Sequence, residues 1–244
     1  MINIDSIDIL KLREQFKNHN RIIINNFLLN DQAESLHEFY NEKMPSNWWH
    51  ASSYPSFTKG DVHEFIPVID ENYHTIQINK SYSNKCLNDN IYSYFFYRTL
   101  PHIEGCECLH CSIHNFLCTP KMVNILNEIT DLKLEKPTTI FANKYTSDCF
   151  LATHTDDGNG RLAFVLHLTK NWNACWGGLY MDHTDPNNIK TVIPSFNKMV
   201  MFKVGNNQTP HSVSCVTNNL TRKRISVTGC TFLIGVPIDD SINI

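Results

Sequence analysis

The sequence predicts a mainly β protein with some α-helix: a double-stranded β-helix (jelly roll) with N-terminal helical elements packed outside it. The main observation is a series of eight short strand-like runs after residue 136, separated by Asn, Gly, Asp and Pro turns. The runs are TTIFANKY, CFLATH, RLAFVLHL, GGLYMD, KTVI, KMVMFKV, HSVSCV and RISVTGCTFLI. In addition, 244 residues with 42% hydrophobic content can bury a substantial core. We expect an α/β support region at 1–136 and the jelly-roll core at 137–244, together forming one compact domain.

The N-terminal region begins with the pattern of a short helix followed by a strand. Residues 5–18 predict the helix, with Asp5 or Ser6 as its N-cap. Its apolar residues recur with roughly helical spacing; they are Ile7, Leu10, Leu12 and Phe16. Residues 21–28 are rich in β-branched side chains and predict a buried strand.

The middle of the support region alternates clear and weak patterns. Asn30 or Asp31 is expected to cap a second helix over 33–44, whereas residues 45–90 predict an irregular region with one strand near HTIQI. Residues 91–99 return to strand-like composition. Pro120 then opens a helix with an apolar face made of Met122, Ile125, Leu126 and Ile129.

Composition and charge exclude several classes of partner. The formal net charge is −3, and the tight basic cluster Arg222–Arg224 is too small an electrostatic footprint for nucleic acid or an anionic membrane. No stretch resembles a signal peptide or a membrane span. The nine cysteines are odd in number and partly scattered, which favours free thiols in a reducing compartment. We expect a cytoplasmic protein, or a nuclear one, that binds neither nucleic acid nor membranes.

Cysteine and histidine are concentrated in the Cys-rich loop 102–118. The stretch contains Cys106, Cys108, His110, Cys111, His114 and Cys118, and His102 lies close enough to join them. Thiolates and imidazoles at this density are typical ligands of structural zinc. The C-x-C-x-x-C spacing lacks the second, distant pair of a zinc ribbon or finger, so a reduced cysteine-rich loop is the alternative. The second-metal hypothesis names Cys106, Cys108 and Cys111, with His102.

A second set of metal-ligating residues lies in the predicted jelly roll. His154 and Asp156 are two residues apart, so on a strand their side chains would point to the same face. The H-x-D triplet alone is weak evidence, because it also occurs in surface turns. His211 follows 55 residues after Asp156, at the start of a strand-like run. Two histidines and one carboxylate on neighbouring strands form the facial triad that holds iron(II) with open positions.

A basic residue follows the third candidate ligand. On the run RISVTGC, Arg224 shares a face with Ser226 and Thr228. A guanidinium inside a barrel is costly unless a carboxylate meets it, and a dicarboxylic co-substrate would supply that partner in bidentate form. This explains the basic cluster without nucleic acid.

At this point the chain resembles the iron(II)- and 2-oxoglutarate-dependent dioxygenases, specifically the prolyl 4-hydroxylase-like branch of intracellular enzymes that modify ribosomal or oxygen-sensing proteins. The motifs that carry the resemblance are KYTSDCFLATHTDD, GRLAFVLHLTKNW, WGGLY, FNKMVMFKV, HSVSCV and RISVTGC. The resemblance implies Fe(II), 2-oxoglutarate and O2, and it leaves open whether ascorbate is also used. It also implies a protein or peptide substrate that is hydroxylated at a prolyl residue.

The resemblance also assigns roles to individual residues. It implies that the iron ligands are His154, Asp156 and His211. Arg224 would bind the distal carboxylate of 2-oxoglutarate, and it matches the family pattern better than Arg222. Thr228 would support that carboxylate, and Tyr145 would border the site. His167 occupies a position where the family usually has tyrosine, which leaves co-substrate affinity open because the charge of histidine varies with pH.

Two other functions remain open from the sequence. The same enzyme chemistry could act on a free amino acid or another small molecule. Alternatively, the chain could be a non-catalytic jelly-roll binding module organised by zinc at Cys106–Cys118. The joint presence of His154, Asp156, His211 and Arg224 argues against this last reading, because a binding module does not need all four.

Overall fold

The computed structural model describes most of the chain. The described residues are 3, 7–54, 64–67, 92–100, 105–158, 160–206, 208–217 and 223–233. Three features discussed above, HTIQI at 74–78, His102 and Arg222, lie outside them. Among the described residues, no helix combines the length and the apolar character that crossing a bilayer requires.

The first helix and strand follow the predicted order, with shifted ends. Helix α1 spans Ile9–His19 and strand β1 spans Arg21–Asn25. The predicted cap at Asp5 or Ser6 was wrong, because the Asp8 side chain accepts a hydrogen bond from the Lys11 amide at 3.0 Å. Leu10 was placed on the wrong face: it is 79% exposed, since the helix turns it away from the core.

The second helix continues into irregular helical turns. Helix α2 spans Asn30–Glu38 and passes into a π-helix, η2, at Phe39–Lys43, followed by a 3-10 turn, η3, at Ser46–Trp48. The predicted cap at Asn30 or Asp31 was wrong, because the helix begins one residue earlier and Leu29 at the N-cap makes no side-chain bond.

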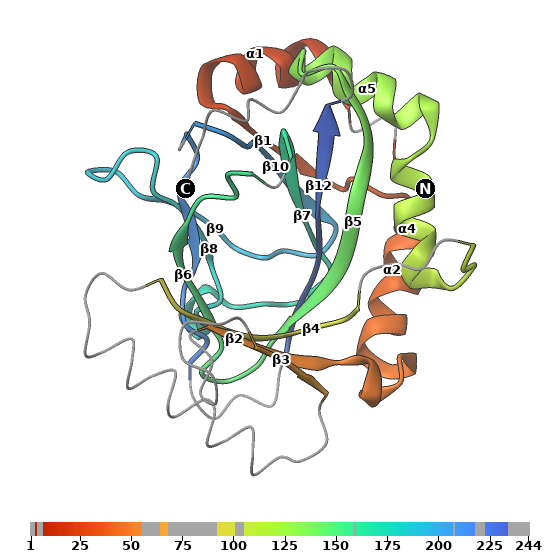
Figure 1. Cartoon of the computed structure of the whole chain (residues 1–244), viewed down its shortest axis with the longest axis vertical. Coiled ribbons are helices and arrows are strands. Elements are labelled where there is room, and N and C mark those ends of the chain that lie inside the picture. Colours follow the sequence, from red (N-terminus) through yellow and green to blue (C-terminus); the bar gives the residue numbers. More distant parts are fainter. Residues whose placement is uncertain are drawn as a thin grey trace.

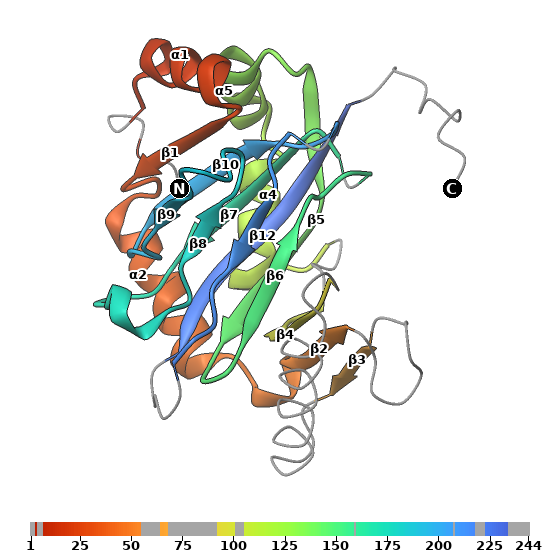
Figure 2. The same cartoon turned by 90° about the vertical axis from the view of Figure 1, so that its left-hand side faces the viewer.

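Part of the region expected to be irregular forms strands that join the main sheet through β4. Strands β2 (His50–Tyr54) and β3 (Glu64–Pro67) pair antiparallel, and β2 also pairs with β4 (Tyr94–Arg98). In Figure 2 these three strands lie together at one end of the barrel. Their pairing is long-range, so short runs such as HASSY carried little local signal.

Two further helices precede the jelly roll. Helix α4 (Leu109–Leu117) occupies the stretch expected to be a cysteine-rich loop, and α5 (Pro120–Thr130) begins at the predicted proline behind Thr119 as N-cap. The predicted core face of α5 is confirmed by its buried residues Met122, Leu126 and Ile129. The helix at 109–117 was missed because its cysteines and histidines suggested a metal-binding loop.

All eight predicted strand runs form strands. They are β5 (Leu134–Tyr145), β6 (Phe150–His154), β7 (Leu162–His167), β8 (Tyr180–Asp182), β9 (Lys190–Val192), β10 (Lys198–Lys203), β11 (His211–Val213) and β12 (Arg224–Leu233). A short 3-10 turn, η4 (Ala174–Trp176), lies between β7 and β8. The strand order is β1-β10-β7-β12-β5-β4-β6-β11-β8-β9, and the neighbouring strands run antiparallel.

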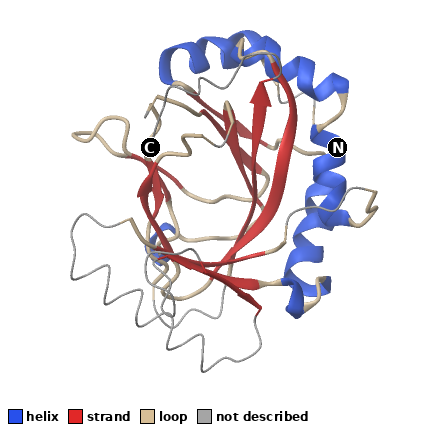
Figure 3. Cartoon of the chain, viewed as in Figure 1, coloured by secondary structure: helices blue, strands red, loops and turns tan. Residues whose placement is uncertain are grey.

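The sheet curls so that its two halves face each other around an interior. Strand β4 links them, because Tyr97 and Arg98 pair with β5 while Tyr94 and Phe95 pair with β6. Figures 1 and 3 show the helices on the outside of the half that contains β1, β7, β12 and β5. The structure is therefore the predicted mainly antiparallel jelly roll with helices packed outside it.

Strand periodicity separates the core from the interior of the barrel. On β12, Ile225 and Val227 point outward into the main hydrophobic core, which they share with helix residues such as Phe16 and Leu126. Arg224 and Ser226 are also buried but face the opposite side, into the barrel. One face of the sheet thus stabilises the fold while the other lines a polar pocket.

Candidate active site

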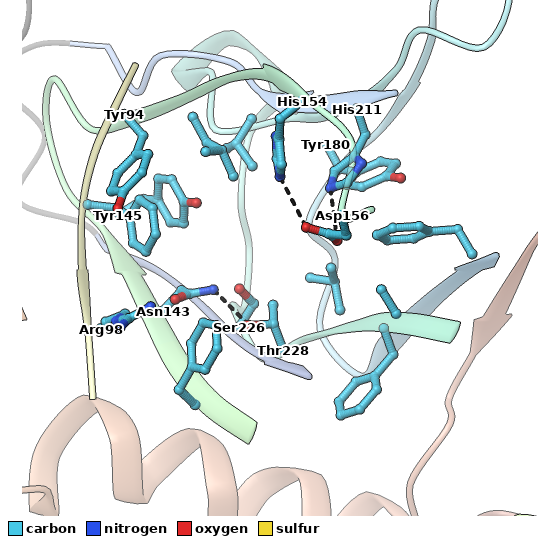
Figure 4. Close-up of a pocket in the computed structure, with 18 of the residues that line it drawn as sticks. Tyr94, Arg98, Asn143, Tyr145, His154, Asp156, Tyr180, His211, Ser226 and Thr228 are labelled. Carbon is cyan, nitrogen blue, oxygen red and sulfur yellow. Dashed lines mark hydrogen bonds and ion pairs between the residues drawn. The ribbon is translucent and has the colours of Figure 1, made fainter. Parts of the chain in front are cut away.

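The three predicted metal ligands meet on two paired strands. His154 is the last residue of β6, His211 is the first residue of β11, and the antiparallel register places them opposite each other. Asp156 follows His154 by two residues, just beyond the strand. Figure 4 shows the carboxylate of Asp156 between the two imidazoles. This single strand pair brings together two histidines that are 57 residues apart in the sequence.

The geometry of the group suits one metal ion. The ligand atoms of His154, Asp156 and His211 all lie within 4.8 Å of one another. Nε2 of His154 is 3.5 Å from one Asp156 oxygen, and Nε2 of His211 is 3.7 Å from the other. Two imidazoles and one carboxylate are the donor set of the facial triad that binds iron(II). The residues present therefore fit the metal that the sequence pattern implies.

Backbone carbonyls fix the orientation of both imidazoles. Nδ1 of His154 donates to the Ala152 carbonyl and Nδ1 of His211 donates to the Thr209 carbonyl, each at 3.0 Å. With Nδ1 protonated, the lone pair of each neutral ring is on Nε2, directed at the centre of the group. Burial and the neighbouring His154 lower the pKa of His211 to about 4, so this ring is neutral and able to ligate at neutral pH.

Arg224 is a buried cation without an acidic partner among the described residues. It is 1% exposed, and it is the first residue of β12, opposite Tyr145 on β5. Its guanidinium carbon lies 4.7 Å from the centre of the Tyr145 ring, while its Nε makes no hydrogen bond. Burial lowers the pKa of Arg224, yet a guanidinium remains charged at neutral pH. A buried charge of this kind favours binding of an anion, since no acid of the described residues balances it.

The triad and Arg224 line one pocket of about 830 Å³ inside the barrel. Aromatic rings from β4 and the residues before it form another wall, and the Tyr92 ring lies 5.6 Å from that of His154. The volume is typical of a small-molecule site. A five-carbon dicarboxylate would fill part of it and leave room for a substrate side chain. In Figure 4 the polar side chains converge on this space from several strands.

Comparison with known proteins identifies the domain that carries these residues. Residues 140–231 match the model of the 2OG-Fe(II) oxygenase superfamily, and this segment includes the triad and Arg224. The chain contains a 2OG-Fe(II) oxygenase domain. The mouse (Mus musculus) prolyl 3-hydroxylase OGFOD1 is 35% identical over 111 residues, which are 43% of this chain and 20% of the mouse protein. The likeness thus covers about a fifth of that relative's length.

Solved structures share the fold of the 2OG-Fe(II) oxygenase domain and its N-terminal helices. A prolyl-4-hydroxylase of Pseudomonas putida superposes with a TM-score of 0.57 at 17% identity, covering 93% of this chain and all of that one. A prolyl hydroxylase of Trichoplax adhaerens, solved with a hypoxia inducible factor peptide fragment, gives a TM-score of 0.56 at 15% identity, covering 92% and 88%. At these identities the likeness shows the fold.

The polar floor of the oxygenase pocket contains Thr228, which was predicted, and Asn143, which was not. Thr228 faces the pocket as predicted, and its Oγ1 accepts a hydrogen bond from Nδ2 of Asn143 at 3.0 Å. Asn143 was not predicted, although it lies two residues before Tyr145 and strand periodicity could have found it. Its buried Oδ1 has no hydrogen-bond partner, so it is available to a ligand.

His167 is enclosed beside this floor. It is fully buried, it pairs with Ser226 in the register of β7 and β12, and neither ring nitrogen has a hydrogen-bond partner. Burial, together with the positive charges of Arg224 and Lys198, holds the pKa of His167 well below its usual range. The imidazole is therefore neutral next to a cationic centre that lacks an anion.

Gly178 makes room for the Arg224 side chain, and its neighbour Gly177 lies against the Cys215 backbone. A Cβ at Gly178 would lie 3.1 Å from Cδ of Arg224, and Gly178 has a φ of +62°. At Gly177 a Cβ would lie 1.9 Å from the Cys215 carbonyl oxygen, so only glycine fits. The WGGLY motif was recognised in the sequence as a pattern, but its contact with Arg224 is evident only in the fold.

The remaining predicted ligands lie elsewhere. Cys106, Cys108 and Cys111 do come together, at the start of α4 and outside the oxygenase pocket.

Arg98, on β4, lines the pocket and was not predicted as a site residue; its guanidinium carbon is 5.1 Å from the Phe141 ring. The site thus combines the predicted triad and anchor with a wall from the support region that local patterns did not mark.

Proposed function

We propose that this protein is an iron(II)- and 2-oxoglutarate-dependent dioxygenase that hydroxylates a prolyl residue of a protein. The observation that carries the proposal is the joint presence, in one pocket, of a facial triad and a buried arginine without an acidic partner among the described residues. A metal site alone would not require Arg224, and an anion site alone would not require the triad. A metal-chelating dicarboxylate uses both.

Each part of the co-substrate has matching groups in the chain. Iron(II), 2-oxoglutarate and O2 together supply an oxidising reaction in which the co-substrate becomes succinate and carbon dioxide and one oxygen atom enters a substrate C–H bond. His154, Asp156 and His211 would hold the metal on one side and leave the other side open. Arg224 would pair with the distal carboxylate in bidentate form, and its guanidinium is positioned by the Tyr145 ring.

Hydrogen-bonding groups on the floor would complete the co-substrate site. Thr228 and Asn143 lie on adjacent strands and are already joined to each other. His167 can donate from a ring nitrogen to the carboxylate bound by Arg224. Arg224 and His167 are almost fully buried, and a low local dielectric strengthens charge-assisted bonds made there.

Substrate class follows from the chemistry of the remaining wall. Tyr92, Tyr94 and Phe96 offer aromatic faces against which an apolar pyrrolidine ring can pack. Among the described lining residues the only acid is Asp156, a proposed metal ligand, so the amino group of a free amino acid would lack a counter-ion. This favours a prolyl residue within a polypeptide. The names of the mouse and Trichoplax relatives support the same substrate class.

The metal and co-substrate steps can be tested in the absence of oxygen. Wild-type protein mixed anaerobically with iron(II) and 2-oxoglutarate should show the weak visible charge-transfer band of the chelate. His211→Ala should lack the band while keeping the circular dichroism spectrum of a folded protein. No band in the wild type, or an unchanged band in His211→Ala, would refute the proposal.

The substrate requires a separate measurement. Proline-containing peptides from a cell lysate digest should gain one oxygen atom on a prolyl residue, with an equal amount of succinate formed. Free L-proline at the same concentration is the matched competitor. Turnover of free proline with no peptide modified would assign the enzyme to small molecules instead.

A further inference from the structure

A cluster of three thiols lies outside the oxygenase pocket and has no part in the proposed reaction. The Sγ atoms of Cys106, Cys108 and Cys111 all lie within 4.8 Å of one another. The three cysteines form no disulfide with any described residue; Cys111 is buried, and the other two are partly exposed. The cluster sits where the chain enters α4, which packs against the outer side of β5 (Figure 1).

We propose that these three cysteines bind a zinc(II) ion as thiolates, forming a structural metal site separate from the iron centre. Three sulfur ligands leave the fourth tetrahedral position to water or another donor. A Zn–S bond of about 2.3 Å places sulfurs about 3.8 Å apart in a tetrahedral site, so the observed spacing needs only a small contraction. Thiolates select zinc over the hard cations and over the iron(II) suited to a carboxylate–imidazole site.

The number of thiols favours a metal over a disulfide. Cys108 and Cys111 alone would suffice for a C-x-x-C disulfide, and the third thiol would then be surplus. In a metal site all three are used. Gly105, with a φ of +78°, gives the backbone immediately before Cys106 a conformation that side chains rarely adopt. The turn thus directs Cys106 back towards the helix.

The start of the helix also favours negative charge at this position. Cys108 is the N-cap residue of α4 and makes no side-chain capping bond, and Cys111 lies in the first turn. Free backbone amides and the helix dipole stabilise thiolates at a helix N-terminus. A hydrogen bond with the Cys108 backbone, and further ones with the Cys108 and Cys111 thiols, lower the pKa of Cys106. The lowered pKa of the Cys106 thiol supports the geometric argument for the cluster.

The proposed zinc site lies beside a buried contact between η2 and α4. Tyr40 of η2 is fully buried, and its hydroxyl is 2.9 Å from Nδ1 of His110. In the sequence, His110 lies between Cys108 and Cys111. Burial raises the pKa of Tyr40 well above its usual range, and the nearby Cys108 and Cys111 add to that effect. The ion would order the start of α4 beside this buried contact. This inference does not rest on the proposed oxygenase activity.

Cobalt(II) can report on the cluster in the full-length protein. Metal-free, reduced protein titrated with cobalt(II) should develop a strong near-ultraviolet sulfur-to-cobalt charge-transfer band. Imidazole and carboxylate ligands give no such band, so the iron site does not interfere. The band should disappear in Cys106→Ser/Cys108→Ser, which changes the two partly exposed ligands. It should persist in Cys118→Ser, a matched cysteine at the other end of the same helix, and in His211→Ala.

Zinc content and thermal unfolding complete the test. Zinc-loaded wild type and Cys118→Ser should each hold one more equivalent of zinc than Cys106→Ser/Cys108→Ser. Zinc should also raise the unfolding temperature of His211→Ala, in which the triad is broken. No charge-transfer band in the reduced wild type, or an undiminished band in the double variant, overturns the proposal. A Cys108–Cys111 disulfide in the isolated protein, with no zinc bound after reduction, overturns it in favour of a redox pair.

Discussion

Two buried arginines lie in the same barrel, and they differ in how their charge is neutralised. Arg21, at the start of β1, is 5% exposed and forms an ion pair with Asp182 of β8. Arg224, at the start of β12, is 1% exposed and has no acidic partner within the part of the chain that the structure describes. The first charge is balanced inside the chain, whereas the second has no counter-charge among the described residues and favours an anionic ligand.

The surroundings of the two guanidiniums lead to the same distinction. Arg21 packs 5.4 Å from the Tyr180 ring and 5.9 Å from the Phe202 ring. Both rings in turn pack against His211, at 5.5 and 4.5 Å. Arg21 therefore packs against the two rings that contact His211 and does not line the pocket, whereas Arg224 does. Burial alone does not identify a binding residue; the balance of charge around it does.

The largest expected effect is the loss of Arg21. Arg21→Met should lower the free energy of unfolding by about 3 kcal/mol, because it leaves Asp182 as a largely buried, unpaired charge. For a chain of this size the unfolding temperature should fall by about 10 °C. Differential scanning calorimetry measures this. The double variant Arg21→Met/Asp182→Leu should recover much of the loss, and a fully stable single variant would contradict the structural role of the pair.

Arg224→Met should lower co-substrate affinity without lowering stability, the opposite of Arg21→Met. Removing an unpaired buried charge and replacing it with a side chain of similar volume should leave the stability of the ligand-free protein unchanged or raised. Affinity for 2-oxoglutarate should fall by about 100-fold, since two charge-assisted hydrogen bonds are lost. Thermal shift with and without 2-oxoglutarate separates the two effects. A destabilised variant with normal co-substrate affinity would make Arg224 structural, like Arg21.

Gly178→Ala tests whether Arg224 is held in place by the turn behind it. The added methyl would meet Cδ of Arg224 at 3.1 Å, so the guanidinium must shift. We expect 2-oxoglutarate affinity to fall by about 10-fold, the cost of about one misaligned hydrogen bond. Gly205→Ala is the matched control, because its φ is also positive and nothing lies within 4 Å of its Cβ. Equal effects of both variants on affinity would point to backbone strain rather than contact with Arg224.

The strands and the His154–Asp156 pair were predictable from the sequence because they depend on local period, whereas His211 was added by its place at the start of a strand-like run and by the family resemblance. Eight strand-like runs separated by turn residues became eight strands, and the spacing of His154 and Asp156 placed both side chains at one strand end. Arg224 was recognisable because a charge in an apolar alternating run has few structural explanations. These features need only the period of a β-strand and the chemistry of a few side chains.

What the sequence did not reveal depends on contacts between distant segments. The ion pair between Arg21 and Asp182 joins residues 161 positions apart, and no local pattern marks either one. The β2–β4 pairing depends on tertiary contacts in the same way. Asn143 looked like an ordinary strand residue until its bond to Thr228 was seen. Helix α4 was missed because its cysteines suggested chemistry more strongly than its pattern suggested a helix.

The smallest expected effect is a dependence of stability and co-substrate affinity on pH, caused by His167 beside Arg224. The pKa of buried His167 is well below its usual range, so the unfolded chain binds a proton there at a higher pH than the folded chain does. The stability of the ligand-free protein should therefore decline as pH falls below about 6.5, the ordinary histidine pKa. A carboxylate bound at Arg224 would raise the pKa of His167. Co-substrate affinity should then increase as pH falls, by at most about tenfold per pH unit.

His167→Phe and His167→Tyr distinguish the parts of this prediction. The phenylalanine variant should bind 2-oxoglutarate several-fold more weakly at neutral pH, and both should lose the His167 contribution to the pH slope. Tyrosine keeps a hydrogen-bond donor without a charge that changes in this range, so its affinity should be nearly constant between pH 6 and 8. Calorimetric titration is done anaerobically with the metal bound, because ligation keeps the triad residues deprotonated. A slope that persists in His167→Phe would show that another group near Arg224 takes up the proton, and His167 would then be only a packed core residue.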